Sequence, residues 1–188
     1  MVMTTQNLDT RQAEYNKFSN FANISFNCIE YLMDNDEEIW KLLKYNNPDS
    51  WRGANLTKAE KAALVYDGSP NETDYRIFLD LAQDNSWTIE ACILRISPTL
   101  AVPVNYVWGV MCVGFEVFCH YKTNTLSNYT TKIDSVSQRL IEVFNGAEIP
   151  TLGRLYFDYK ASNNSRLLTI GSIPFKGRAL VMCTQSLG

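Results

Sequence analysis

His120 is the single histidine of the 188-residue chain and the side chain best suited to proton transfer. A serine triad, a Cys–His dyad or a zinc–histidine site would have to use it. His120 directly follows Cys119, and neighbouring residues of a strand point to opposite faces, so these two side chains cannot easily act as a pair. The sequence therefore favours a polar residue at the frayed end of a strand.

Carboxylates offer a second route to acid–base chemistry, which needs two titrating groups in one cleft. Asp80, Glu116 and Asp158 all lie in predicted strands and could converge. Glu116 interrupts an apolar run, and we expect it to lie at a solvated strand end or to pair with Arg95 or Arg76. A small enzyme or ligand-binding domain that uses Glu116, His120 and Asp158 is the alternative hypothesis.

The sequence contains no pattern that is typical of a metal or cofactor site. The acidic run Asp34, Asp36, Glu37 and Glu38 lacks the alternating ligands, central glycine and final glutamate of a calcium loop, so it is interpreted as a solvated helix start. The phosphate-loop and dinucleotide-binding motifs are also missing from the sequence. We therefore expect no catalytic residue, no cofactor and no metal.

The cysteines predict a reduced protein. There are five of them, an odd number, and four lie in apolar strand-like contexts, where cysteine behaves as a small buried hydrophobe. A disulfide framework is instead typical of paired cysteines in the loops of secreted chains. We expect reduced thiols in a protein made in a reducing cytoplasm, at Cys28, Cys92, Cys112, Cys119 and Cys183.

Aromatic residues in polar connections are the strongest candidates for a binding surface. Trp51 lies beside Arg52 in one connection, and Trp87 lies in another. Tryptophan, tyrosine and arginine are enriched at protein–protein hot spots, although such aromatics can equally cover the core from outside. Tyr156 and Tyr159, beside a polar loop, have the same two interpretations. The candidate interface residues are Trp51, Arg52, Trp87, Tyr156, Tyr159, Asn163, Asn164 and Arg166.

The spacing of hydrophobic residues predicts the helices and strands that position these candidate residues. Apolar residues at three- and four-residue steps predict helices over 20–33 and 34–46. The capping box Thr57-Lys58-Ala59-Glu60 begins a third helix. A fourth helix is predicted over 130–145, where Gly146 is placed to adopt the left-handed conformation that closes it.

Alternating and continuous apolar runs predict the strands. The expected strands cover residues 75–81, 90–97, 107–121, 153–160 and 175–185. Two prolines predict a loop over 98–106, and a polar stretch predicts another over 161–174. The predicted order is ααα-βββ-α-ββ, an α+β fold with N-terminal helices and one mostly antiparallel sheet with a helix packed on it.

These elements predict a simple domain organisation. Residues 1–19 form a polar arm, which is either disordered or ordered on a neighbouring subunit. Residues 20–188 form a single α+β domain, helical over 20–70 and built on a sheet over 71–188.

Composition limits the class of partner. Hydrophobic residues make up 46% of the chain and charged residues 20%, which is enough for a sizeable core. The net charge of -3, with scattered Lys and Arg, argues against a dedicated nucleic-acid-binding protein. The longest apolar stretch, 107–119, is too short to span a bilayer as a helix, and the first fifteen residues do not resemble a secretory signal. We expect a protein that works by binding other proteins.

Several segments together resemble a known class of proteins. They are NFANISFNCIEYLMDNDEEIWKLLKYNNPD, the capped helix LTKAEKAALVYDG, the strand end FEVFCHYKTNT and the helix with its following strand TKIDSVSQRLIEVFNGAEIPTLGRLYFD. Over residues 20–187 the chain resembles the neck proteins of tailed bacteriophages, which comprise head–tail connectors, head-closure proteins and tail terminators. The resemblance implies a sheet flanked by helices and carries no catalytic residues.

The resemblance also implies a role and a location. It implies a structural virion protein that is made in the bacterial host cytoplasm and assembles in the neck of the particle. Copies would form a sixfold or twelvefold ring that docks onto portal and adjacent neck or tail proteins, while DNA passes the lumen without sequence-specific contacts. The 98–106 and 161–174 loops and the polar arm agree with segments that reach a neighbour. A phage-encoded regulatory binding module remains a further alternative.

Overall fold

The first part of the structure is helical, as the periodicity predicts. The computed structural model describes residues 20–71, 73–79, 90–103, 109–150, 152–157, 166–169 and 175–184. The expected N-terminal arm, residues 1–19, lies outside the described residues. The helical elements before the sheet are η1 (Asn20–Asn23), α2 (Ile24–Asn35), α3 (Glu38–Lys44), η2 (Ser50–Arg52) and α4 (Lys58–Ala62).

Side-chain hydrogen bonds fix where two of these helices begin. At α4 the Thr57 hydroxyl accepts the Glu60 N–H, and the Glu60 carboxylate accepts the Thr57 N–H at 2.8 Å, which confirms the predicted capping box. At α3 the Asp36 carboxylate accepts the Ile39 N–H at 2.7 Å. Asp36 is also buried and pairs with Arg139 of α5 (Lys132–Phe144). The prediction of a solvated helix start is therefore wrong for Asp36.

The second part builds the sheet. Within the described residues its strand order is β1-β2-β3-β8-β6, and β7 also pairs with β8. Only the β1–β2 pairing is parallel among these pairs. The strands are β1 (Ile77–Phe78), β2 (Cys92–Pro103), β3 (Gly109–His120), β6 (Tyr156–Phe157), β7 (Arg166–Thr169) and β8 (Phe175–Cys183), and a separate hairpin pairs β4 (Glu148–Ile149) with β5 (Gly153–Arg154). The predicted fold class, helices followed by a mostly antiparallel sheet with a helix packed on it, is confirmed.

Two prolines lie inside β2, where the sequence predicts a loop over 98–106. β2 pairs with β3 along its whole length, with a register shift between Pro98 and Leu100. Proline cannot donate a ladder hydrogen bond, so within sheets it occurs at edges and bulges. On the outer side of β2, the pairing with β1 ends at Arg95. The loop prediction is wrong for residues 98–103, because a bulged edge strand does not need the donors that proline lacks.

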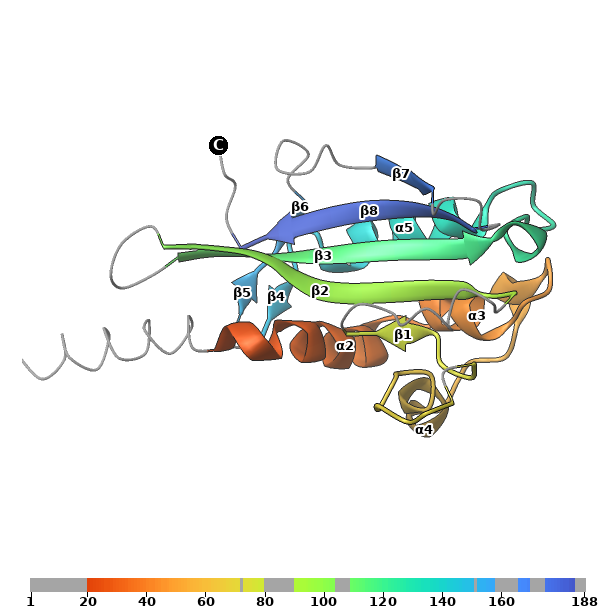
Figure 1. Ribbon diagram of the computed structural model, residues 1–188, viewed down its shortest axis with the longest axis horizontal. Coiled ribbons are helices and arrows are strands. Elements are labelled where there is room, and N and C mark those ends of the chain that lie inside the picture. Colours follow the sequence, from red (N-terminus) through yellow and green to blue (C-terminus); the bar gives the residue numbers. More distant parts are fainter. Residues whose placement is uncertain are drawn as a thin grey trace, which may run out of the picture.

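The main core lies between one face of the sheet and the helices. Helix α5 packs against β3 and β8, and it is seen behind these strands in Figure 1, while α2 and α3 pack against β2. Ile133, Val136, Leu140 and Phe144 form the buried stripe of α5. Gly146 follows this helix with φ +84, which confirms the predicted left-handed closing residue.

A smaller aromatic cluster lies on the opposite face of the sheet. Its buried members are Phe78, Ile93, Phe118 and Phe175, and Tyr66 and Tyr75 pack against them. Phe118 lies opposite Gly177 of β8. A Cβ atom at Gly177 would lie 2.5 Å from Phe118 Cδ1 and 2.9 Å from the Val117 carbonyl oxygen. Glycine is therefore required here because the phenyl ring occupies the space of a side chain.

Three short segments differ from the predicted strands and loops. Among the described residues 75–79 of the predicted strand 75–81, β1 covers Ile77–Phe78. Residues 153–157 of the predicted strand 153–160 are divided into β5 and β6. The predicted loop 161–174 contains β7, which pairs with the first half of β8, so the loop prediction is wrong for residues 166–169. Strands of two to four residues are too short to show a readable alternation.

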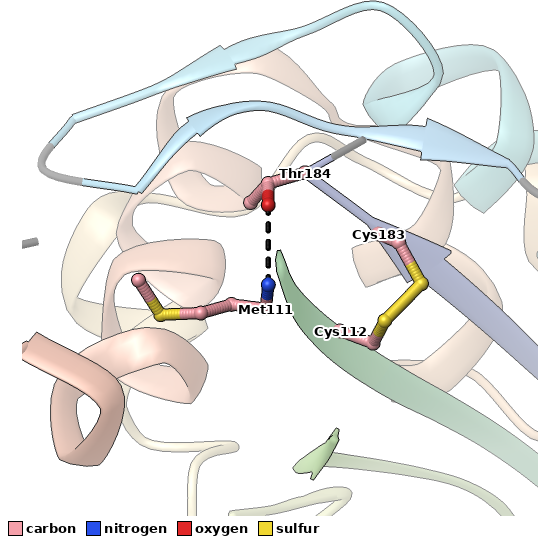
Figure 2. The surroundings of a disulfide bond; sticks show 4 residues. All are labelled: Met111, Cys112, Cys183 and Thr184. Atoms are coloured by element: carbon pink, nitrogen blue, oxygen red, sulfur yellow. Dashed lines mark hydrogen bonds between the residues drawn. A yellow bond between two sulfur atoms is a disulfide. The ribbon is translucent and has the colours of Figure 1, made fainter. Parts of the chain in front are cut away.

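A disulfide joins two of the five cysteines. Cys112 of β3 and Cys183 of β8 are direct cross-strand partners with Cα atoms 4.1 Å apart, and Figure 2 shows their bond beside Met111 and Thr184. The expectation of five reduced thiols is therefore wrong for this pair. Pairing across a sheet depends on strand register, which cysteine spacing does not reveal. Cys28, Cys92 and Cys119 are free and buried.

Candidate interaction surface

Trp51 and Arg52, two predicted interface residues, lie on η2 and contact a turn distant in sequence. The Ser127 N–H donates to the Pro48 carbonyl at 3.0 Å, and the Ser127 hydroxyl donates to Asp49 Oδ1 at 2.6 Å. The indole N–H of Trp51 donates to Ser127 Oγ at 3.5 Å. These bonds hold the two segments side by side.

The turn over residues 125–130 presents a tyrosine to solvent. Its base is fixed by the Leu126 N–H, which donates to the Thr130 carbonyl at 2.9 Å, and by the Asn128 side chain, which accepts the Thr130 N–H. Tyr129 has φ 65, and it is the one non-glycine residue with positive φ in the described part of the chain. Its side chain is 97% exposed. Tyrosine rarely adopts this conformation, and such strain is most often found at functional sites.

Trp51 covers the core from outside, because its partly buried side chain packs against the main core. This is one of its two predicted interpretations, and the other, contact with a partner protein, stays a prediction. The Arg52 guanidinium lies over the ring at 4.4 Å from the centroid, within the range of a cation–π contact. Arg52 itself is largely exposed, and its ion pair with Asp49 is long, at 3.9 Å. The indole is thus held rigid by the core while its neighbour remains available to a partner.

These residues define the Trp51–Tyr129 surface, which comprises Asp49, Trp51, Arg52, Ser127, Asn128 and Tyr129. Rigid aromatic and arginine side chains supply much of the binding energy of protein interfaces, because they bury large areas at a low cost in conformational entropy. The chemistry of this surface suits the recognition of another protein.

The remaining predicted interface residues do not join this surface. Tyr156 is exposed on β6, which pairs with the Cys183 end of β8, whereas the Trp51–Tyr129 surface lies near the Phe175 end. The nine residues of β8 place these ends roughly 26 Å apart. Arg166 begins β7, opposite Ala179 near the middle of β8. Trp87, Tyr159, Asn163 and Asn164 lie outside the described residues.

Sequence reasoning missed Tyr129, Asn128 and Ser127. The Ser127-Asn128 pair before Tyr129 indicates a turn, because an asparagine side chain can bond the backbone two residues on. The pairing of this turn with the Pro48–Asp49 segment is a contact over almost eighty positions, and no local pattern predicts it.

The alternative acid–base site is not assembled by the described side chains. Glu116 forms the predicted cross-strand ion pair with Arg95. Glu116 and His120 lie four residues apart on β3, so their Cα atoms are separated by about 13 Å. Each side chain is held by a different group, the Glu116 carboxylate by Arg95 and the imidazole of His120 by the Lys122 N–H, so the two do not act on a shared proton. Asp158, the third member, lies outside the described residues.

His120 has a structural environment instead. It is the last residue of β3, which confirms the predicted strand end, but it is buried, so the prediction that this end is frayed is wrong. Its Nδ1 accepts the Lys122 N–H at 3.3 Å and caps η4 (Tyr121–Thr123). The imidazole lies 4.8 Å from the ring of Tyr121 and edge-on to Phe175 at 5.3 Å, measured between centroids. Aromatic packing and capping account for this histidine.

Two hollows in the described part of the chain lie elsewhere. One, of about 300 Å³, is lined by residues of α2 and by Pro150. The other, of about 350 Å³, lies between α4 and the segment before β1. Neither is lined by Glu116 or His120, so these hollows do not support a site built from those residues.

Among the described residues, no group of three or more His, Cys, Asp and Glu side chains is placed to hold a metal ion. Within the same ranges, no helix is both long enough and apolar enough to cross a membrane.

The fold defines a class: an α+β protein whose antiparallel sheet is packed on one face by helices, with an exposed aromatic surface at one end. The family model YomW matches residues 36–182, most of the chain, and the protein therefore belongs to the YomW family. The family name derives from an SPβ-like prophage of Bacillus, so this is a phage-associated protein. No curated protein sequence matches the chain.

Proposed function

We propose that this protein is a structural component of a tailed-phage virion that forms a ring in the neck and joins the head to the tail. The observation that carries the proposal is Tyr129, which is 97% exposed and held at φ 65 by a hydrogen-bonded turn. An isolated monomer gains nothing from a strained and solvated tyrosine. A partner that buries the ring would repay that strain.

The position of the surface suits head-to-tail assembly. The segment between β3 and α5 lies at one end of the elongated molecule, beyond the arrowhead of β3 in Figure 1. A contact between one end of a subunit and a different face of the next copy is heterologous, and such contacts close into rings when the rotation permits. The resemblance to neck proteins and the phage-associated family support a sixfold or twelvefold ring docked to portal, neck or tail proteins.

Two alternatives would use different features. A small enzyme or ligand-binding domain would need Glu116 and His120, which are bound to other groups. A regulatory binding module could use the Trp51–Tyr129 surface without assembling. Gene neighbourhood separates it from a neck protein, because a neck role predicts portal and tail genes nearby.

The test is the assembly state of the full chain and of variants at this surface. We expect light scattering and negative-stain imaging to show rings for the unaltered protein, alone or with portal or tail components. Tyr129→Gly and Trp51→Ala should shift the population to smaller species. Phe26→Ala is the matched control, because Phe26 is an exposed aromatic on α2, outside this surface, and it should leave assembly unchanged.

Tyr129→Gly separates assembly from folding. Glycine adopts positive φ without the cost of roughly 1–2 kcal/mol that other residues pay, although it loses about 0.5–1 kcal/mol through greater freedom in the unfolded chain. We therefore expect the variant monomer to be as stable as the unaltered protein, or slightly more stable, while its assembly is weakened. A strictly monomeric protein that binds no portal or tail component would contradict the proposal.

A further inference from the structure

The central strand β3 carries two cysteines on opposite faces, and each lies directly opposite a cysteine of a neighbouring strand. Cys112 lies opposite Cys183 of β8 and forms the disulfide described above. Cys119 lies opposite Cys92 of β2, and both of these thiols are free. The second pair therefore repeats the arrangement of the first on the other side of the same strand.

Both pairs occupy the same kind of position in the hydrogen-bond ladder. The Thr184 N–H donates to the Met111 carbonyl at 2.9 Å, which makes the adjoining Cys112–Cys183 pair non-hydrogen-bonded. The His120 N–H donates to the Ala91 carbonyl at 3.0 Å, so the adjoining Cys92–Cys119 pair is also non-hydrogen-bonded. Such pairs have the closest approach in an antiparallel sheet, with Cα atoms about 4.5 Å apart, which lies within the range that a disulfide spans.

The environment of the free pair favours sulfur exchange chemistry. Cys92 and Cys119 lie opposite each other across β2 and β3, and Thr123 Oγ1 lies 3.6 Å from Cys119 Sγ. The neighbouring Cys92 thiol lowers the pKa of Cys119, and Thr123 and the Lys132 ammonium act in the same direction. The pKa of Cys92 is raised by the neighbouring Cys119 thiol and by burial. Cys119 is thus the better nucleophile of the pair.

Cys28 provides a contrast within the same chain. Burial raises the pKa of its thiol to about 12, with no hydrogen bond or charge acting in the opposite direction. It lies on α2, and no cysteine is described as its partner among the placed residues. Cys28 is expected to remain a thiol under conditions that oxidise a paired site.

We propose that Cys92 and Cys119 are a second cross-strand disulfide site, which closes when the protein meets a small disulfide oxidant such as oxidised glutathione. The Cys119 thiolate attacks one sulfur of the oxidant, its S–S bond breaks, and one thiolate leaves. The Cys92 thiol then gives up its proton and attacks Cys119 Sγ, which releases the second thiolate. Two protein thiols are oxidised to one disulfide, the oxidant is reduced to two thiols, and the protons end on those products.

The second bond would complete a covalent connection across three strands. β3 would be tied to β8 on one face and to β2 on the other, so neither neighbour could separate from it. This inference does not depend on assembly, because it rests on strand register within one chain. A protein made in a reducing cytoplasm and released into an oxidising medium would acquire the bond after synthesis.

The experiment is a peptide map of the full chain after exposure to oxidised glutathione. One sample is oxidised in the native state, and another during refolding from denaturant, since the native pair is buried. Remaining thiols are alkylated under denaturing conditions and located by mass spectrometry. We expect a linked Cys92–Cys119 peptide, two fewer alkylated cysteines and an alkylated Cys28. Linkage of Cys92 to Cys119 in either sample supports the site. The refolding sample is included because oxidised glutathione can reach these cysteines before they become buried.

Variants provide a check that does not depend on the linked peptide alone. Cys28→Ser should leave the linkage intact, while Cys119→Ser should leave Cys92 fully alkylated. The proposal is overturned if Cys92 and Cys119 stay alkylated in both samples while Cys112–Cys183 is fully linked. A stable mixed disulfide of glutathione with either cysteine would overturn it as well, since the opposing thiol should displace the adduct.

Discussion

Replacing Cys112 and Cys183 together with alanine removes the disulfide between β3 and β8. Both side chains are buried in a small cluster with Val110, so alanine avoids leaving an unpaired hydroxyl there. The replaced side chains are small and the register of the strands is otherwise unchanged. The main effect should therefore come from the greater freedom of the unfolded chain.

The expected loss of stability follows from the length of the loop that the disulfide closes. The two cysteines are separated by 71 positions. Loop-closure entropy for such a length gives a loss of about 4 kcal/mol in the free energy of unfolding. For a chain of this size each kcal/mol shifts the melting temperature by about 2–4 °C, so the expected decrease is roughly 8–16 °C.

The assay is equilibrium unfolding in urea with and without a reducing agent. The unaltered protein should lose about the same stability on reduction as it loses on substitution. The double variant should respond to reducing agent only if Cys92 and Cys119 have also become linked. A double variant as stable as the unaltered protein under oxidising conditions, or an unaltered protein that ignores the reducing agent, would refute the reasoning.

Three smaller predictions concern single contacts. Gly177→Ala should cost about 1–3 kcal/mol in urea unfolding, because the new methyl group overlaps the phenyl ring opposite it. Thr57→Ala should cost about 0.5–2 kcal/mol through the lost capping box. Hydrogen bonds from Thr57 lower the pKa of Glu60, so the carboxylate stabilises the folded protein fully above pH 4.5 and loses this effect as the pH falls through its folded-state pKa. Unfolding measured at several pH values should therefore show a smaller cost of Thr57→Ala at low pH. Glu116→Ala should destabilise the protein more than the double substitution Arg95→Leu/Glu116→Leu, because it leaves a half-buried guanidinium unpaired; equal losses would contradict this.

Local chemistry accounts for the features that the sequence predicted correctly. The Thr57–Glu60 capping box and the closing Gly146 each depend on a few adjacent residues, and both are present. Glu116 was expected to pair with Arg95 or Arg76, and the register of β2 against β3 places Arg95 opposite it. A single charge inside an apolar strand is costly without a partner, which is why the sequence predicts an ion pair for Glu116.

Features that depend on tertiary position were missed. Pro98 would exclude a strand only if that strand had a hydrogen-bonded neighbour on both sides. β2 has no partner beside Pro98 on its outer side, since its pairing with β1 ends at Arg95, and the sequence does not show this. Cys112 and Cys183 become partners through strand register. The placement of the 125–130 turn depends on the bond between Ser127 and Asp49, which is far away in sequence. In each case the deciding contact lies outside any local window.

We propose that this protein is part of the neck of a tailed-phage particle. Electron microscopy of purified particles of a phage that encodes the chain, labelled with an antibody against the protein, tests this proposal directly. A neck protein should carry label at the junction between head and tail, on every particle with an attached tail. Particles that carry no label, or label confined to another part of the virion, would contradict it.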